Sequence, residues 1–179
     1  RVIVPVHMLG VSCKNDQIFQ IAKKNKIKVL EDNCESVGGK YKKKFLGTLG
    51  DIGVFSLDFG KFITTGEGGT LLTNNKKYYK FMREYHDHGH ENNPKLSRGE
   101  DTKTIAGFNY RMTELQAVIG KEQIKRVDYI LKENYKRYQL LNKYLSKKFE
   151  LREIPKNSKS NYDTFIFYVK KNEKKKILK

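Results

Sequence analysis

One lysine lies in a segment that is otherwise poor in charge, and its surroundings suit covalent chemistry. Lys61 belongs to the stretch Ser56–Gly69, which is rich in glycine and threonine. The apolar runs at 51–56 and 68–73 each predict a buried strand. A loop held between two core strands is a common place for reactive groups, and a lysine partly removed from water is a nucleophilic amine able to form a Schiff base. The local pattern also allows a lysine that simply points into solvent.

Two further polar side chains follow predicted strands. Strands predicted at 2–7 and 27–31 flank a helical pattern, and this spacing is typical of a right-handed βαβ unit in a parallel sheet. Asp32 comes directly after the second of these strands, and Ser56 ends the strand that precedes Lys61. Ligands of open α/β sheets bind at the carboxyl ends of the strands. The side chains of Asp32, Ser56 and Lys61 are therefore candidates for one site.

The rest of the chain predicts mostly helices, with one long polar loop at 87–106 that is either functional or mobile. The apolar stripe from Ile124 to Tyr144 indicates core packing between domains rather than a cofactor site. We expect a large domain over 1–148 and the beginning of a small domain over 149–179. The other predicted elements are an exposed basic hairpin at 41–45, helices at 76–85, from Thr113 and over 121–147 with a break or bend at Gly120, a strand at 164–169 and a basic helical stretch at 173–179.

The charge balance is strongly basic. The chain has 37 Lys and Arg against 20 Asp and Glu, a net charge of +17, and seven of the basic residues are arginines. Readout of bases favours arginine, and no motif of stacking aromatics accompanies the lysines. We therefore interpret the lysines as a solvated surface, with a basic module that binds nucleic acid or polyanions as the alternative.

No apolar run reaches the ~18 residues of a membrane helix, and the first residues do not form a signal peptide. Cys13 and Cys34 do not form a CxxC pair, so a disulfide framework is not expected. A reducing compartment fits this cysteine usage best, and we predict a cytoplasmic protein.

Two other motifs could bind ligands. His86, His88 and His90 alternate as metal ligands would, but no fourth ligand is evident and a solvated loop is the preferred interpretation. The run Gly66–Gly69 lacks the Gly-Lys-Ser/Thr ending of a nucleotide-binding P-loop, so its glycines more simply permit tight turns. We expect no metal site.

Six segments, taken in order, resemble the DegT/DnrJ/EryC1/StrS family of pyridoxal-phosphate-dependent sugar aminotransferases. The resemblance runs through residues 1 to about 150 and implies an α/β fold, with a three-layer α/β/α large domain of the aspartate-aminotransferase kind (fold type I) and a mostly parallel sheet. The segments are Val4–His7, Glu31–Ser36, Gly47–Gly53, Ser56–Gly69, His88–Gly89 and Gly107–Met112.

The resemblance implies a role for each matching residue. Lys61 would hold pyridoxal 5'-phosphate as a Schiff base and then shuttle the proton, Asp32 would pair with the pyridine nitrogen, and Ser56 would bind the phosphate. Asn109 matches an asparagine that reaches the phosphate of the neighbouring subunit, which implies a homodimer. Glu35 falls beside the cofactor ring where the family usually has glutamine; capping a helix is its alternative role.

The implied reaction moves an amino group, from glutamate in most of the family, to a keto group of a nucleotide-linked sugar in polysaccharide biosynthesis. Related sugar dehydratases have histidine where this chain has Lys61, so the lysine favours amine transfer. The family's phosphate loop and ring-stacking aromatic precede the position of Arg1. We therefore expect a chain truncated at both ends, and a cofactor-free pseudo-enzyme is an alternative.

Overall fold

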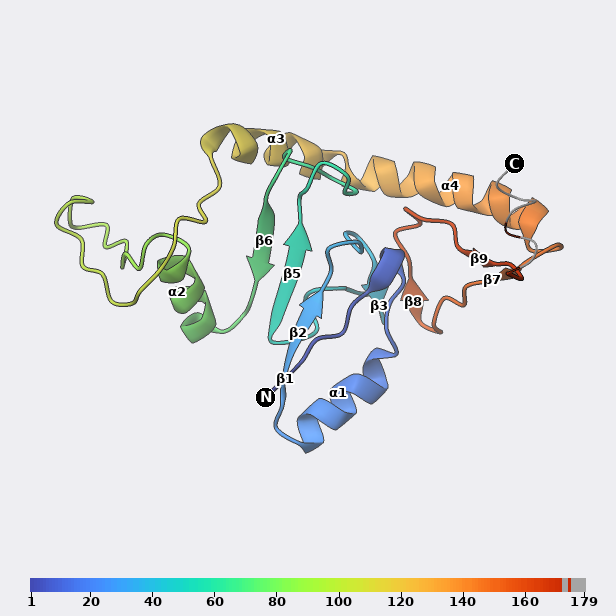
Figure 1. Cartoon of the computed structure of the whole chain (residues 1–179), viewed down its shortest axis with the longest axis horizontal. Coiled ribbons are helices and arrows are strands. Elements are labelled where there is room, and N and C mark those ends of the chain that lie inside the picture. The colour runs from blue at the N-terminus through green and yellow to red at the C-terminus, as the bar shows by residue number, and fades with distance from the viewer. Residues whose placement is uncertain (172–173, 175–179) are drawn as a thin grey trace.

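The computed structural model, which describes residues 1–171 and Lys174, is built around a four-stranded sheet with the order β1–β2–β5–β6 (Figure 1). Its strands are β1 (Val2–Ile3), β2 (Lys28–Asp32), β5 (Ile52–Ser56) and β6 (Gly69–Leu72). β2 runs parallel to both β1 and β5, and only β6 is antiparallel. The predicted α/β fold with a mostly parallel sheet is confirmed.

Helix α1 (Asn15–Lys24) connects β1 to β2 and completes the predicted βαβ unit. A short 3-10 helix, η1 (Met8–Gly10), precedes it. Ala22 on α1 is buried, and Lys23 and Lys24 lie in the last turn, where cations interact favourably with the helix dipole.

Helices α2 and α3 begin at side chains that satisfy free backbone N–H groups. Asn75 accepts hydrogen bonds from two backbone N–H groups at the start of α2 (Lys76–Tyr85). Thr113 and Gln116 form a capping box at the start of α3 (Glu114–Lys125), which leads into α4 (Val127–Leu145). Figure 1 shows α3 and α4 end to end along one side of the molecule, with α1 on the opposite side. Among the described helices, none is both long and apolar enough to cross a bilayer.

The predicted basic hairpin is confirmed as β3 (Lys40–Tyr41) and β4 (Lys44–Phe45), and β8 (Ser158–Lys159) extends it to three strands. Lys42 and Lys43 have φ of 47° and 68°, the left-handed values that a two-residue type I′ turn requires. The last pair, β7 (Glu150–Leu151) and β9 (Phe167–Tyr168), is antiparallel. The division at 148 stays a prediction, and β8 pairs with β3 across it.

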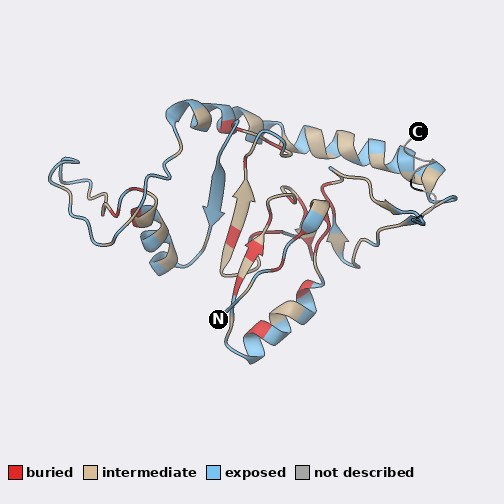
Figure 2. Ribbon diagram, in the orientation of Figure 1, coloured by how far each residue is buried: buried red, intermediate tan, exposed pale blue. Residues whose placement is uncertain are grey.

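Two strands predicted to be buried are not. All four residues of β6 are exposed, and Val2 and Val4 near β1 are 56% and 48% exposed. Within the described part of the chain these strands form the two edges of the sheet, so each has only one neighbouring strand. β5 is only partly buried, and Figure 2 shows the buried residues concentrated at β2, at part of β5 and in the loops beside them.

The break between the two long helices is at Arg126, and the expected break at Gly120 is wrong. Gly120 is buried within α3, where an added Cβ would lie 3.0 Å from the Thr65 side chain. The glycine thus lets α3 approach the loop that follows Lys61. The strand predicted at 164–169 is shorter, Phe167–Tyr168, and the helical stretch predicted at 173–179 lies outside the described residues apart from Lys174.

The apolar stripe of α4 packs only in part, because no residue of this helix is fully buried. Tyr138 contacts Tyr162 and Phe165, with ring centroids 4.8 and 5.1 Å apart. Ile124, Leu141 and other members of the stripe remain exposed. The part of the stripe that packs includes the aromatic contacts with 162–167 and Leu131, whose side chain lies against Gly38.

Asp87 closes the long loop between α2 and α3. Its carboxylate binds Arg98 at 2.9 Å and Arg111 at 3.1 Å, and its side chain is 6% exposed. The Arg98 hydrogen bond is the main cause that lowers the pKa of Asp87 to about 2. The preferred interpretation of 86–90 as a solvated loop is wrong for Asp87 and Gly89, which are both buried.

Replacing this carboxylate by an amide should loosen the loop. We expect Asp87→Asn to lower the free energy of unfolding by about 1 kcal/mol at neutral pH. A carboxylate with a depressed pKa contributes stability above its unfolded pKa of about 4 and loses it as the pH falls toward about 2. Urea unfolding at pH 7 and pH 2.5 measures this, with the exposed Glu153→Gln as control. A difference between Asp87→Asn and the parent that is as large at pH 2.5 as at pH 7 would contradict the assignment.

Candidate active site

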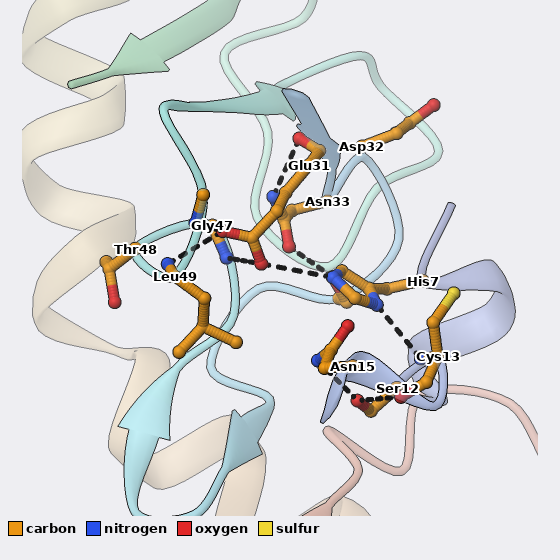
Figure 3. A network of polar contacts seen from close by, with 12 residues as sticks. His7, Ser12, Cys13, Asn15, Glu31, Asp32, Asn33, Gly47, Thr48 and Leu49 are labelled. Atoms are coloured by element: carbon orange, nitrogen blue, oxygen red, sulfur yellow. Dashed lines mark hydrogen bonds and ion pairs between the residues drawn. The ribbon is translucent and has the colours of Figure 1, made fainter. Parts of the chain in front are cut away.

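Asp32 lies at the carboxyl end of β2 and faces away from the protein core. Its backbone N–H donates to Pro5 O at 2.9 Å and its carbonyl accepts from His7 N at 3.0 Å, which fixes the strand end against the segment after β1. Figure 3 shows the Glu31 and Asp32 side chains pointing in opposite directions, as neighbours on a strand do. The Asp32 carboxylate accepts one hydrogen bond, from Cys34 N at 3.0 Å.

Glu31 is fully buried on the other side of this strand and accepts four hydrogen bonds (Figure 3). Leu49 N and Gly50 N donate to one oxygen at 2.7 Å each, while Gly47 N at 3.0 Å and His7 Nε2 at 3.2 Å contact the other. Burial alone would raise the pKa of Glu31, but the hydrogen bonds from His7 and the three amides outweigh it and lower the pKa. The buried carboxylate thus connects β2 to the turn at 47–50.

His7 continues the same network toward α1. Its Nδ1 accepts the Cys13 N–H at 3.1 Å, so the contact with Glu31 uses Nε2–H. Directly after β2, Asn33 Nδ2 donates to the Glu31 carbonyl at 3.0 Å. Both ends of the Asp32 backbone are therefore held by buried polar contacts.

Lys61 points toward Glu35, with 3.7 Å between Nζ and Oε1. The two side chains are 24% and 34% exposed, so a solvent-facing lysine is not what the structure shows. The other Glu35 oxygen accepts the Leu9 N–H at 2.8 Å. Glu35 does not cap a helix, since it lies in a turn and bonds to a distant segment.

Helix α3 holds the loop after Lys61. Gln116 Nε2 donates to the Glu67 carbonyl at 2.8 Å, and Thr65 N donates to the Leu57 carbonyl at 2.9 Å. Gly68 has φ of 152° and packs close to Met112. These contacts explain the glycine-rich sequence, because side chains at these positions would separate the loop from the helix.

The Cys34 thiol lies among three of the predicted site residues. Burial is the main cause that raises its pKa to about 11, with a further contribution from Asp32. The charge of Lys61 and the backbone N–H of Ser56 act in the opposite direction. Asp32 and Ser56 end the neighbouring parallel strands β2 and β5, and Lys61 follows β5 in the chain.

Asn109 is separate from this group. It is exposed and accepts a hydrogen bond from Arg111 Nε at 3.1 Å. Among the described residues, no hydrogen bond joins it to Lys61, Asp32 or Ser56. Its role toward a neighbouring subunit stays a prediction.

Two residues near the site were missed from the sequence. Asn161 Nδ2 donates to the Glu35 carbonyl at 2.9 Å. Burial is the main cause that raises the pKa of Asp163, and the charges of Glu35 and Lys61 have smaller effects on it. Both lie more than a hundred positions after Glu35, in a segment with no recognisable motif. Cys34 belongs to the segment Glu31–Ser36, and the sequence predicts no role for it.

The cysteines and two of the histidines have partners or states that the structure defines. Cys13 and Cys34 are free thiols. His86 Nδ1 contacts the Arg83 carbonyl at 2.6 Å, and His90 faces Asp101 at 3.5 Å. Over residues 1–171, no group of three or more His, Cys, Asp or Glu side chains is arranged to hold a metal ion.

One family matches the chain over its whole length. The family model of the DegT/DnrJ/EryC1/StrS aminotransferases covers residues 1–179. The chain belongs to this family.

Particular relatives agree with this assignment. GDP-perosamine synthase of Caulobacter vibrioides is 41% identical over 128 residues, which are 72% of this chain and 33% of that protein. The GDP-perosamine synthase of Escherichia coli O157:H7 is 35% identical over 92% of this chain and 43% of its own length. The chain thus spans less than half of the curated relatives it matches.

The solved aminotransferase of Psychrobacter cryohalolentis superimposes with a TM-score of 0.81 at 31% identity. The match covers 90% of this chain and 45% of that protein. The order of helices and strands described above is therefore that of an aminotransferase over almost the whole chain.

The buried carboxylate of Glu31 should be essential for stability. We expect Glu31→Gln to lower the free energy of unfolding by about 3 kcal/mol, because the amide NH₂ would face backbone donors and leave them unpaired. Urea unfolding followed by circular dichroism measures this, and the exposed Glu67→Gln is the matched control. Equal stability of the two variants would show that the network contributes nothing specific.

Proposed function

We propose that this chain carries the catalytic lysine of a pyridoxal 5'-phosphate-dependent aminotransferase. The reaction moves an amino group, from glutamate, to a keto group of a nucleotide-linked sugar in polysaccharide biosynthesis. The observation that carries this proposal is the partly buried Lys61 amine, which faces the carboxylate of Glu35 at 3.7 Å, and Glu35 follows Asp32 at the end of β2 by three residues. Family membership over 1–179 supports it.

The residues present fit this cofactor. Its aldehyde requires an amine, and Lys61 offers one beside a carboxylate at 3.7 Å. Its pyridine nitrogen requires an acid partner, and one oxygen of Asp32 bonds to Cys34 N, which leaves the other for the ring. Its phosphate requires donors, and the Ser56 hydroxyl accepts from Asp58 N at 3.3 Å and keeps its own hydrogen to donate. When bound, the cofactor supplies an electron sink for the carbanion formed on the amino donor.

Each side chain then has a separate task. Lys61 would hold the cofactor and, once free of it, would move the proton at the reacting carbon of the amino donor. Asp32 keeps the ring nitrogen protonated, and the backbone contacts of Asp32 hold its carboxylate in place. Glu35 orients the Lys61 amine, and Ser56 anchors the phosphate end.

The names of relatives support the substrate class and the surroundings of the reaction. Two relatives are named GDP-perosamine synthases, and a GDP-linked product favours a nucleotide-linked substrate here. The exposed Asn109 is available to a second subunit, so we infer a homodimer that shares its active sites. A cytoplasmic location follows from such a substrate.

The covalent step can be observed directly. We expect the purified protein with pyridoxal 5'-phosphate to absorb near about 400 nm and to lose that band on borohydride reduction, because a Schiff base forms on the amine. Mass spectrometry should place the reduced adduct on Lys61. Lys61→Ala should lack both signals and Lys76→Ala should keep them. Salt-sensitive binding of polyanions without the absorbance band would instead favour a basic binding module. A folded dimer without the absorbance band would favour a cofactor-free pseudo-enzyme.

The ring carboxylate can be tested separately. We expect Asp32→Asn to retain the absorbance band but to slow amine transfer from glutamate at least about a hundredfold, because the ring nitrogen loses the charge that keeps it protonated. Single-turnover absorbance measures this. Asp58→Asn, an equivalent change in the lysine loop, serves as control. An equal loss in both variants would contradict the assignment to Asp32.

A further inference from the structure

Asn161 connects the C-terminal region of the chain to the lysine site. It is fully buried, and its Nδ2 donates to the Glu35 carbonyl at 2.9 Å. Its Oδ1 accepts the Asp163 N–H at 3.2 Å. A buried amide that satisfies both its donor and its acceptor in this way holds the two segments in one arrangement.

The turn at Met8–Gly10 completes this junction. Gly10 has φ of +78°, and a Cβ there would lie 1.9 Å from Asn161 Oδ1, so only glycine fits against the amide. The preceding residue, Leu9, donates its N–H to Glu35 Oε2 at 2.8 Å. Two segments that are distant in sequence therefore meet at Glu35. The segment of Asn161 bonds to its carbonyl, and the segment of Leu9 bonds to its carboxylate.

The remaining carboxylate oxygen of Glu35 faces Lys61 Nζ at 3.7 Å. Asp163 is close to the same pair. Burial is the main cause that raises the pKa of Asp163, an Asn134 hydrogen bond opposes it, and smaller effects come from the charges of Glu35 and Lys61. The one ion pair that the described residues give to the amine is therefore the contact with Glu35.

We propose that Asn161 is a positioning residue for Lys61 and acts through Glu35. The carbonyl bond from Asn161 and the amide bond from Leu9 hold Glu35 in the orientation that faces the amine. Without Asn161, Glu35 loses the contact at its backbone carbonyl and keeps only the Leu9 contact at its carboxylate, so the side chain can turn away from Nζ. The importance of this for catalysis rests on the proposed function, but the contact itself does not.

The test measures the reactivity of the Lys61 amine without cofactor. The purified protein is acetylated with sulfo-N-hydroxysuccinimide acetate, and mass spectrometry follows Lys61 relative to the exposed Lys76. We expect Glu35→Gln to raise the relative rate about threefold, because the ammonium form loses a partly exposed ion pair. Asn161→Ala should raise it to the same extent. The double variant should show no further increase, because both changes remove the same contact.

Ser160→Ala is the matched control. Ser160 is buried next to Asn161, but its hydroxyl accepts from Tyr162 N within its own segment. In the Ser160→Ala variant, Lys61 should be acetylated at the same relative rate as in the parent protein. If Asn161→Ala is unfolded by circular dichroism, Asn161→Ser, whose hydroxyl is too short to reach the Glu35 carbonyl, takes its place.

A parent rate in the folded Asn161 variant overturns the proposal, and so does an additive effect in the double variant. An equal rise in Ser160→Ala overturns it as well, because the effect would then come from general loosening. The absorbance of the parent protein with pyridoxal 5'-phosphate is a separate measurement. The proposed function can therefore fail there while the contact between Asn161, Glu35 and Lys61 stands.

Discussion

The arrangement of the site depends on one buried charge. Glu31 is removed from water and can remain ionised only because backbone amides and a histidine donate to both its oxygens. Those donors come from the turn at 47–50 and from the segment after β1, so meeting this electrostatic requirement also assembles the strand ends. Asp32, the next residue, then lies on the opposite side of a strand whose end is fixed by these hydrogen bonds. The buried acid is structural, and its half-buried neighbour is the carboxylate that we propose for the chemistry.

The order of elements was largely predictable because it rests on local patterns. Alternating apolar runs predicted the strands around Lys61, and Asn75 and Thr113 predicted the starts of α2 and α3 through their hydrogen bonds to nearby N–H groups. Burial was predicted less well, since an apolar strand reads the same at the centre and at the edge of a sheet. β6 is the clear example. Gly120 was also misleading, because its role is to approach Thr65 rather than to end a helix.

The site was predicted only as far as its motifs reached. Asp32 and Ser56 end two neighbouring strands and Lys61 follows the second, so sheet topology was enough to predict one site. The environment of Glu35 was not accessible in this way. Its two fixed partners, Leu9 and Asn161, lie 26 positions before it and 126 after it, and neither belongs to a recognisable pattern. Contacts between such distant segments depend on tertiary packing, which no local sequence rule describes.

The two bare edges of the sheet have a practical consequence for anyone preparing this polypeptide. β6 presents Thr70, Leu71 and Leu72 to water as an apolar strand, and no proline or charged side chain interrupts the run. Such an edge is a template for strands of other molecules, and self-association through it produces insoluble material. The high positive charge of the chain opposes this at low ionic strength, but added salt weakens that repulsion. Concentrated stocks are therefore best kept at low ionic strength. Light scattering on titration with sodium chloride would detect self-association through β6.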